Sequence, residues 1–145
     1  MPMRKKNMTD YKDNFMLTDV KPTIMEHLSD IKHLLEQTYW AKERDMQTIE
    51  TSVKYSLCYG IFDVERDVMV GFARIITDYA TMYYLTDVVV DKEYRGQGLG
   101  TWMLDWILKE EIKLKGYGLL KTKEAQELYV RYGFEECEAT CMVRL

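Results

Sequence analysis

The sequence has few of the residues that form domain linkers, disulfide bonds or membrane-spanning segments. It contains two prolines, at positions 2 and 22, and no Gly/Ser-rich linker, so nothing marks a boundary between two domains within its 145 residues. Its three cysteines, Cys58, Cys137 and Cys141, include no C-x-x-C pair, which indicates neither a disulfide framework nor a zinc site. Three reduced thiols are typical of the cytoplasm. No uncharged stretch approaches the ~20 apolar residues of a membrane span.

The charge balance argues against one class of partner and indicates a folded core. The formal net charge is −4 and the pI is near 5.3, so the chain lacks the basic field that a nucleic-acid-binding protein needs. Apolar residues make up 47% of the chain, enough to bury a core. The basic start lacks the apolar stretch of a secretory signal. We therefore expect residues 1–145 to form a single cytoplasmic domain, with residues 1–13 as a loose tail.

Two amphipathic helices are expected in the first third of the chain, after a short strand at residues 15–17. Thr23 and Glu26 form a capping-box pattern, and apolar residues at helical spacing follow, which predicts a helix over residues 23–38. Met46, Ile49 and Val53 share one face of a second predicted helix over residues 41–55.

The hydrophobic period then changes from helix to strand. Three runs rich in Val, Ile, Tyr and Phe predict an antiparallel meander: Leu57–Asp63, Val68–Thr77 and Met82–Val90. Beyond them we expect a helix from residue 99, a strand over residues 118–121, a helix over residues 125–132, and closing strands at residue 134 and residues 141–145. This order predicts an α/β fold with a mixed, mostly antiparallel sheet of six to seven strands and about four flanking helices.

The segment between the last meander strand and the next helix carries the clearest chemical signal. Three glycines, Gly96, Gly98 and Gly100, fall within five residues directly before the helix. Glycines let a backbone approach a ligand closely, and the first N–H groups of a helix have no partner within it. With the positive end of the helix dipole they make an anion site, which suits a diphosphate. Arg95 adds a cation for charge-assisted contacts.

The spacing of these glycines differs from that of two common phosphate loops. A P-loop has a lysine after its last glycine, and none follows Gly100. A dinucleotide-binding fingerprint has G-x-G-x-x-G at the start of a βαβ unit, whereas Gly96, Gly98 and Gly100 follow a meander. The remaining pattern, R-x-x-G-x-G, resembles the pyrophosphate loop of the GNAT superfamily of acetyl-CoA-dependent N-acetyltransferases.

A second segment resembles the same family. Ala125, Leu128, Tyr129, Gly133 and Phe134 match the A-x-x-L-Y-x-x-x-G-F signature near the end of GNAT domains. The order of expected elements agrees with that family over most of residues 15–134. The chain is most similar in kind to small, stand-alone bacterial GNAT proteins, and the resemblance implies a sheet that splays between the family's fourth and fifth strands, here residues 82–90 and 118–121.

The resemblance implies a co-substrate and the residues that bind it. In the family, the splay admits the pantetheine arm of acetyl-CoA and the loop amides hold its diphosphate, without a metal. Thr122 stands where many members have Asn, so its contact is a hydroxyl in place of an amide. The matching positions in this sequence are Val88, Val89, Val90, Arg95, Gly96, Gln97, Gly98, Leu99, Gly100, Thr101, Thr122 and Tyr129.

The resemblance also implies direct attack of a primary amine on the thioester, with Tyr129 protonating the departing thiolate. Helical spacing alone would place Tyr129 in a core stripe. An amine of pKa ~10.4 is neutral in about one molecule in 10³ at pH 7, so a base must remove a proton, directly or through water. Thr86 occupies the position of a glutamate base found in some members. The remaining carboxylates are Asp87, equally explained as a structural bulge residue, Asp78, Glu43 and Asp45.

The acceptor pocket is expected between the first two helices and the meander. A W-A-x-x-R element there resembles small bacterial members, and the predicted substrate-binding residues are Tyr39, Trp40, Arg44 and Arg74. Tyr39 and Trp40 either form an aromatic wall or anchor the helix junction. The two arginines favour an acceptor that carries a carboxylate, whereas the nearby aspartates favour a cation, and both alternatives stay open.

Two classes of function follow. The first is an enzyme that acetylates the primary amine of a small molecule or of a protein. The alternative is a non-catalytic acyl-CoA sensor or an interaction module of the same fold. The expected partners are acetyl-CoA and an amine, with no nucleic acid, membrane or metal, and a homodimer through sheet edges is a further expectation.

Overall fold

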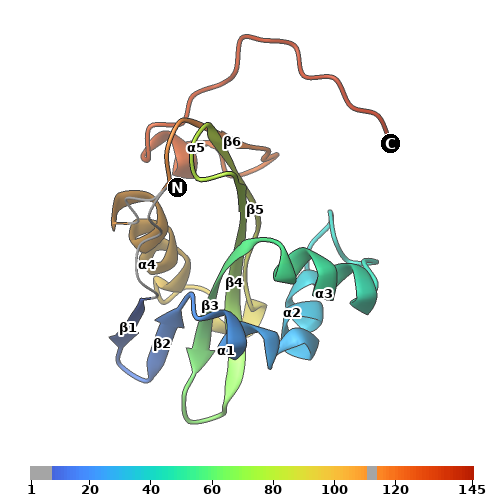
Figure 1. The fold of residues 1–145 in the computed structure, drawn as a ribbon. Coiled ribbons are helices and arrows are strands. Elements are labelled where there is room, and N and C mark those ends of the chain that lie inside the picture. Colours follow the sequence, from blue (N-terminus) through green and yellow to red (C-terminus); the bar gives the residue numbers. More distant parts are fainter. Residues whose placement is uncertain (1–7, 111–113) are drawn as a thin grey trace.

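The computed structural model describes residues 8–110 and 114–145, which form a six-stranded sheet with helices on both faces (Figure 1). The strands lie in sequence order: β1 (Thr9–Lys12), β2 (Phe15–Thr18), β3 (Leu57–Asp63), β4 (Val68–Thr77), β5 (Met82–Val90) and β6 (Tyr117–Leu120). The helices are α1 (Lys21–Met25), α2 (Leu28–Leu35), α3 (Met46–Lys54), α4 (Leu99–Asp105) and α5 (Gln126–Val130), with a 3-10 turn, η1 (Lys92–Tyr94), and a π-helical segment, η2 (Trp106–Glu110), that continues α4. The predicted α/β fold with a mixed sheet is confirmed.

The central meander has the bounds that the sequence predicts. β3 pairs antiparallel with β4, and β4 pairs antiparallel with β5. Every residue of β3 is buried, as expected for an apolar strand that is covered on both faces. These three paired strands form the frame from which the glycine loop and the open strand edge project.

The N-terminal segment is not a loose tail throughout, because Thr9–Lys12 forms β1. This strand pairs antiparallel with β2, and Lys12 lies opposite Phe15 across the turn. All four residues of β1 are exposed, so the sequence carries no apolar alternation that would have identified a strand. Main-chain pairing and a hydrogen bond from the Trp102 indole to Asp10 (3.2 Å) hold it in place. Residues 1–7 lie outside the described residues.

The helix predicted over residues 23–38 is two helices. α1 begins after Val20 and has Pro22 in its first turn, where the missing N–H of proline costs no hydrogen bond. Thr23 is therefore inside the helix and the predicted capping box does not form. His27, with φ −118° and ψ 32°, interrupts the helical backbone between α1 and α2.

The second predicted helix starts five residues late. α2 ends at Leu35, where the Thr38 hydroxyl donates to the Leu35 carbonyl (2.7 Å) and accepts the Ala41 N–H (3.1 Å), which directs the chain into a loop. α3 begins only after Asp45, whose carboxylate accepts the Thr48 N–H (2.7 Å) as an N-cap. The connecting loop, residues 36–45, carries the predicted substrate-binding aromatic residues.

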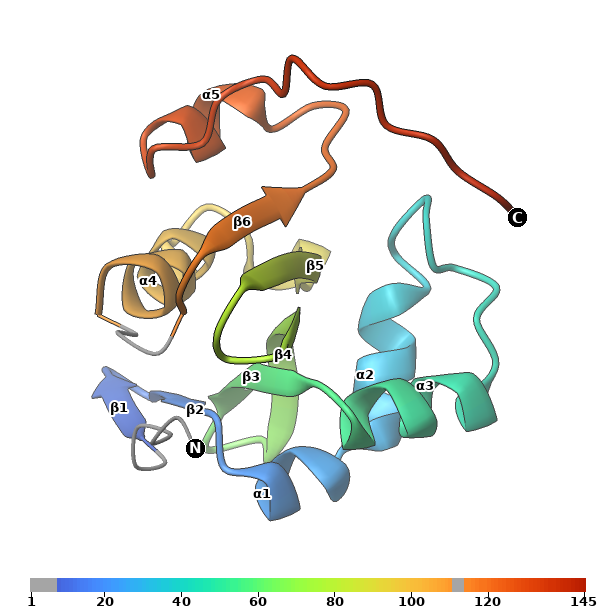
Figure 2. The ribbon, with the colours of Figure 1, turned by 45° about the horizontal axis from the view of Figure 1, so that its top comes forward.

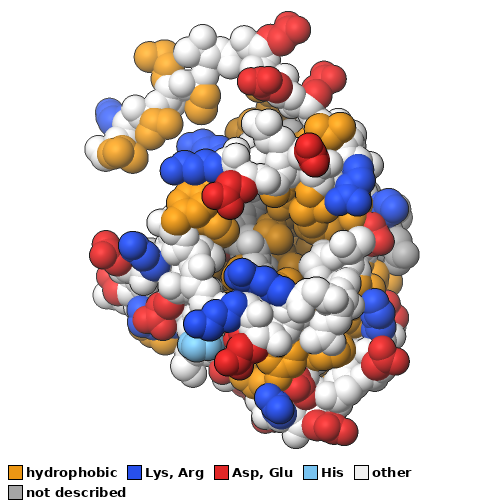
Figure 3. Space-filling model, turned by 180° about the vertical axis from the view of Figure 1, so that it is seen from behind, with side chains coloured by type: hydrophobic (Ala, Val, Ile, Leu, Met, Phe, Trp, Pro, Cys, Tyr) orange, Lys and Arg blue, Asp and Glu red, His pale blue; other side chains and the backbone are white. Residues whose placement is uncertain are grey.

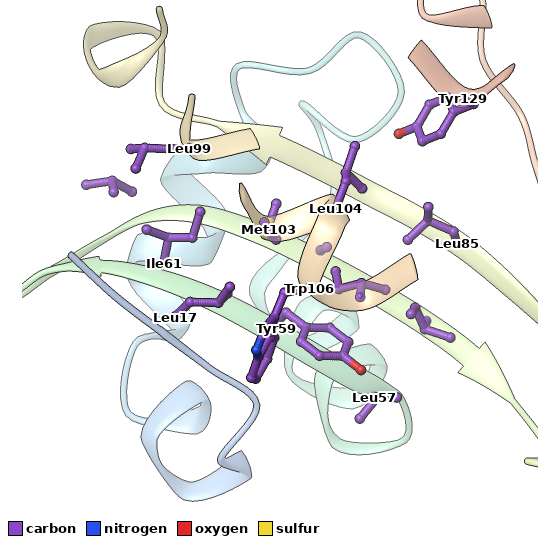
Figure 4. Close-up of a cluster of buried hydrophobic side chains, with 14 residues drawn as sticks. Leu17, Leu57, Tyr59, Ile61, Leu85, Leu99, Met103, Leu104, Trp106 and Tyr129 are labelled. Carbon is purple, nitrogen blue, oxygen red and sulfur yellow. The ribbon is translucent and has the colours of Figure 1, made fainter. Parts of the chain in front are cut away.

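Each face of the sheet buries its own apolar cluster. Helices α1–α3 cover one face, and α4 with η2 covers the other (Figures 1 and 2). In the α4 cluster, Met103 and Ile107 are fully buried and the rings of Tyr59 and Trp106 pack edge to face at 5.7 Å (Figure 4). Tyr129 of α5 belongs to this same cluster.

A bulge at Asp87 changes which cluster the side chains of β5 join. Leu85 packs in the α4 cluster, whereas Val89, four residues later, packs in the α1–α3 cluster; strict alternation would return it to the same face. Asp87 has φ 55°, and the register with β4 shifts beside it. One extra residue in β5 explains the change of face.

The sheet splays after the middle of β5. The short strand β6 pairs in parallel with Met82–Leu85 only, and its last partner pair is Leu85 with Leu120. Within the described part of the chain, residues 86–90 therefore have no strand partner on that side, and Figure 2 shows β6 running at an angle to β5. This is the splay that the sequence predicts.

The closing strands predicted at residue 134 and residues 141–145 do not form. The segment after α5 runs away from the body of the molecule (Figure 1). Residues 135–145 are all exposed, so no apolar face draws this segment onto the sheet. Among the described residues, no helix is long and apolar enough to cross a bilayer.

Candidate functional site

The unpaired half of β5 offers main-chain groups to a ligand. The Asp91 N–H donates to the Val70 carbonyl of β4 (2.8 Å), so the alternation of a strand turns the main-chain groups of Val90 to the opposite, open edge. By the same alternation, we expect the main-chain groups of Val88, two residues earlier, to face this edge as well. The side chain of Arg95 reaches back along this edge, and its Nε donates to the Val90 carbonyl (3.0 Å).

The glycine loop leads from this edge into α4. Gly98 is the N-cap of α4 and has φ 81°, a left-handed conformation that glycine adopts without a steric cost. The loop is anchored at Tyr94, whose hydroxyl donates to Asp63 (2.8 Å) and whose ring packs against Phe15. The N–H groups of the first helical residues have no intrahelical acceptor. They are available to an anion.

A cation that the sequence analysis missed lies at this loop. The Lys12 Nζ is 3.6 Å from the position that a Cβ on Gly98 would take. Lys12 ends β1, at the same end of the sheet as the loop, and it makes no ion pair with the described residues. The sequence shows Lys12 only as a basic residue in a segment without strand character, which does not indicate that it lies beside the glycine loop.

Tyr129 is buried and carries a hydroxyl without a hydrogen bond to the described residues. It packs edge to face on Phe134, with ring centroids 6.0 Å apart. Figure 4 shows the hydroxyl pointing from α5 toward the core cluster. Burial raises the pKa of Tyr129, so the phenol stays protonated at neutral pH.

Four of the residues predicted for the site meet at the bulge of β5. Both Arg44 Nη1 (2.7 Å) and Arg74 Nε (2.9 Å) donate to Oδ2 of Asp87, and Trp40 Nε1 donates to Oδ1 (3.0 Å). The Asp87 side chain is only 1% exposed. Burial alone would raise the pKa of Asp87, but the Arg74 charge and the arginine hydrogen bonds more than offset it, and the pKa is lowered. Asp87 is a poor proton acceptor in this environment.

The other candidate bases lie elsewhere. Asp78 is exposed in the turn between β4 and β5, where its carboxylate accepts N–H groups of Ala80 and Thr81. The Thr81 hydroxyl and these amides lower the pKa of Asp78 far below its usual range. Asp45 caps α3, and Glu43 is exposed in the loop before it. The structure brings only Asp87 to the splay.

Two loops meet beside this cluster. Tyr39, 54% exposed, packs edge to face on Trp40 at 5.0 Å, and the Lys123 Nζ lies 4.7 Å from the Tyr39 ring centroid. Lys123 belongs to the segment between β6 and α5, where Thr122 accepts the Ala125 N–H (3.0 Å) through its hydroxyl. Tyr39 and Trp40 thus line a junction between the α2–α3 loop and the β6–α5 segment.

The surface near these segments is hollowed. Figure 3 shows a depression below the C-terminal segment, with hydrophobic side chains on its floor and both basic and acidic side chains around it. In the described part of the chain, no group of three or more His, Cys, Asp or Glu side chains is placed to hold a metal ion.

A mixed sheet that splays beside a glycine loop defines an acetyltransferase-type fold, and comparison with known proteins agrees. Residues 55–136 match the family model of the acetyltransferase (GNAT) domain. The chain therefore belongs to the GNAT acetyltransferase family.

Individual relatives support this assignment. A Gibberella zeae protein classed by name as an acetyltransferase is 30% identical over 94 residues, which are 54% of this chain and 52% of that protein. The chloroplastic GCN5-related N-acetyltransferase 2 of Arabidopsis thaliana is 30% identical over 46% of this chain and 27% of its own length. The chain thus spans about half, or less, of these curated relatives. A GNAT-family crystal structure from Xanthomonas campestris pv. campestris is 33% identical, with a TM-score of 0.76 and 86% of each chain covered.

Proposed function

We propose that this chain transfers the acetyl group of acetyl-CoA to a primary amine of a small molecule, or of a protein, by direct attack. One observation carries this function: the open edge of β5 joins the Asp87 bulge to the glycine loop, and Tyr129 packs in the cluster that contains Leu85 at the splay. A thioester laid along that edge would have an anion site at one end and a buried acid at the other.

The co-substrate would bind along the open edge. The amides of residues 95–101 would hold the diphosphate, assisted by the charges of Arg95 and Lys12. The pantetheine amides would pair with the main chain of Val88 and Val90, which requires Arg95 to release the Val90 carbonyl. Val90 lies three residues beyond Asp87 along the strand, a distance of ~10 Å. The Thr122 hydroxyl, which accepts the Ala125 N–H and donates to no acceptor among the residues described, would contact the pantetheine arm.

The reaction then needs two proton movements. The neutral amine nitrogen forms a bond to the thioester carbonyl carbon, the C–S bond breaks, and the amine loses one proton. Tyr129 donates its phenolic proton to the departing sulfur and later regains one from solvent. The apolar surroundings that raise the pKa of Tyr129 would also favour the neutral thiol over the thiolate, because both acids have anionic bases.

The amine proton would leave through water and not to Asp87. That carboxylate is occupied by Arg44, Arg74 and Trp40, and its lowered pKa makes it a weak base. Asp87 instead fixes the two arginines at the bulge. Asp78, Glu43 and Asp45 would take no part in the reaction, since Asp78 lies in a turn at the other end of β5 and Asp45 caps a helix.

A thiol-release assay with acetyl-CoA and an amine panel tests this function. Tyr129→Phe should lower kcat at least tenfold while calorimetry shows CoA binding unchanged, because only the proton donor is lost. Tyr132→Phe, in the turn directly after α5 and hydrogen-bonded to Asp105 (2.6 Å), is the matched control. CoA binding without turnover of any amine would favour the acyl-CoA sensor instead, and absence of CoA binding would refute both.

The setting of the protein is part of the same proposal. Cys58, Cys137 and Cys141 are unpaired, which supports the cytoplasm as its compartment. Among the described strands, β6 is at the edge of the sheet and has one unpaired side, which supports a homodimer through sheet edges. Sedimentation at several concentrations would measure the second, and a strictly monomeric protein would contradict it.

A further inference from the structure

We propose that the acceptor amine carries a carboxylate and that Arg44 binds it, an assignment that rests on the proposed acetyl transfer. The charge on the α1–α3 side of the bulge supports it. Two guanidinium groups, from Arg44 and Arg74, share the single carboxylate of Asp87. Guanidinium groups stay protonated in proteins, so this cluster carries one unbalanced positive charge.

The two arginines differ in how fully they are engaged. Arg74 donates from Nε to Asp87 and from Nη1 to the Ser56 hydroxyl (3.0 Å), and its side chain is 11% exposed. Arg44 donates to Asp87 through Nη1 only, among the described residues, and its side chain is 22% exposed. Arg74 is therefore structural. Arg44 keeps the remaining donors of its planar fork for a ligand, in the geometry that suits a carboxylate.

The position of Arg44 suits a group attached to the attacking amine. Asp87, which holds Arg44, lies two residues beyond Leu85, where β6 separates from β5 and the thioester would lie. Trp40, bound to the other oxygen of Asp87, and Tyr39 extend this surface as an aromatic wall. A carboxylate on Arg44 would thus hold the amine of the same small molecule near the open strand edge.

The unbalanced charge favours an acidic group on the acceptor over a second cation. One carboxylate neutralises the single positive charge of the Asp87 cluster, and its planar shape suits the fork of Arg44. A diamine without an acidic group would bring a second cation to a cationic site. The charges therefore favour an amino-acid-like acceptor over a polyamine.

Matched acceptor pairs test this assignment in the thiol-release assay with acetyl-CoA. Each amino acid is compared with its carboxamide, which keeps the amine and the side chain but has no negative charge. For the acceptor that is used, the carboxamide should have a kcat/KM about 10- to 100-fold lower, mostly through KM, the range expected for a hydrogen bond to a charged group. The amine of the carboxamide is less basic, hence more often neutral at pH 7, and this bias opposes the expected result.

Arg44→Gln then identifies the residue. This variant leaves Asp87 paired with Arg74 and Trp40, so the bulge keeps a balanced charge. It should turn over acid and carboxamide with similar kcat/KM, with CoA affinity unchanged by calorimetry and folding checked by circular dichroism. Arg144→Gln, in the exposed C-terminal segment, is the matched control and should keep the preference of the unmodified protein.

Each outcome separates the two proposals. Acetyl transfer with equal use of acids and carboxamides would overturn the carboxylate assignment and leave the acetyltransferase function standing. A preference for acids that survives Arg44→Gln would overturn the role of Arg44. Failure to bind CoA and to release thiol with every acceptor would instead overturn the proposed function itself.

Discussion

Replacing Asp87 by Asn tests what holds the bulge of β5 together. The Asp87 carboxylate is almost fully buried and accepts hydrogen bonds from Trp40, Arg44 and Arg74 at 2.7–3.0 Å. Asn has the same size and also tolerates the positive φ of this position, 55°. The substitution therefore removes the charge and one acceptor oxygen while leaving the backbone conformation accessible.

The expected loss of stability follows from the unpaired arginines. Removing one partner of a buried ion pair costs about 3–5 kcal/mol. Arg44 is partly exposed, so water compensates some of that penalty, and we expect Asp87→Asn to lower the free energy of unfolding by about 3 kcal/mol at pH 7. The pKa of Asp87 is lowered in the folded protein. Its stabilisation is thus complete above the unfolded pKa of ~3.9 and is lost as pH falls through the folded pKa.

Urea unfolding at neutral and acidic pH measures this effect. The difference between Asp87→Asn and the unmodified protein should be largest at neutral pH and shrink in acid. Asp67→Asn is a matched control, because Asp67 also has positive φ, 52°, but its side chain is 91% exposed. That control should change stability by no more than about 0.5 kcal/mol. A loss below about 1 kcal/mol for Asp87→Asn would refute the view that its carboxylate holds the arginines.

Three further results are expected. The kcat/KM for a lysine-like amine should rise about tenfold per pH unit around neutrality, because only the neutral amine attacks. The raised pKa of Tyr129 keeps the acid protonated over this range. A plateau of kcat/KM near neutral pH would point to a protein base. Lys12→Gln should weaken CoA binding about fivefold at low salt and less at high salt, whereas Lys54→Gln, at the end of α3, should not; equal effects would exclude a local contact. Gly116→Ala should destabilise the fold by about 2 kcal/mol more than Gly133→Ala. A Cβ at residue 116 would lie 2.1 Å from the Thr81 main-chain oxygen, whereas a Cβ at residue 133 would have no atom within 4 Å. Equal thermal unfolding temperatures of the two variants would contradict this expectation.

Local pattern was sufficient where a segment's own residues decide its structure. The meander strands β3, β4 and β5 have their predicted bounds, because apolar, β-branched and aromatic runs between polar turns are favourable only when both faces are covered. The R-x-x-G-x-G loop and the segment around Tyr129 likewise identified the family before any contact was known, because their chemistry depends on spacing along the chain.

Pattern failed where the deciding interaction is a hydrogen bond that leaves no mark in the hydrophobic spacing. β1 has only exposed residues and exists because β2 offers it hydrogen bonds. The Thr38 hydroxyl binds the Leu35 carbonyl where α2 ends, and the Asp45 carboxylate caps α3, which therefore starts at Met46. The helical spacing of the apolar residues concealed both of these side-chain hydrogen bonds. The exposed C-terminal segment has a strand-like composition but forms no strand, because it buries no apolar face against the sheet.

The amino-acid order by itself determined the fold class, the glycine-rich loop before α4 and the set of polar residues available to the site. Only the tertiary structure decided how those residues are used. The bulge in β5 turns Asp87 toward the helices, where Arg44 and Arg74, 43 and 13 residues away along the chain, converge on it. Charges interact through space over a few ångströms, so the identity of a base, a structural anchor or a substrate-binding cation depends on which partners folding brings within that distance.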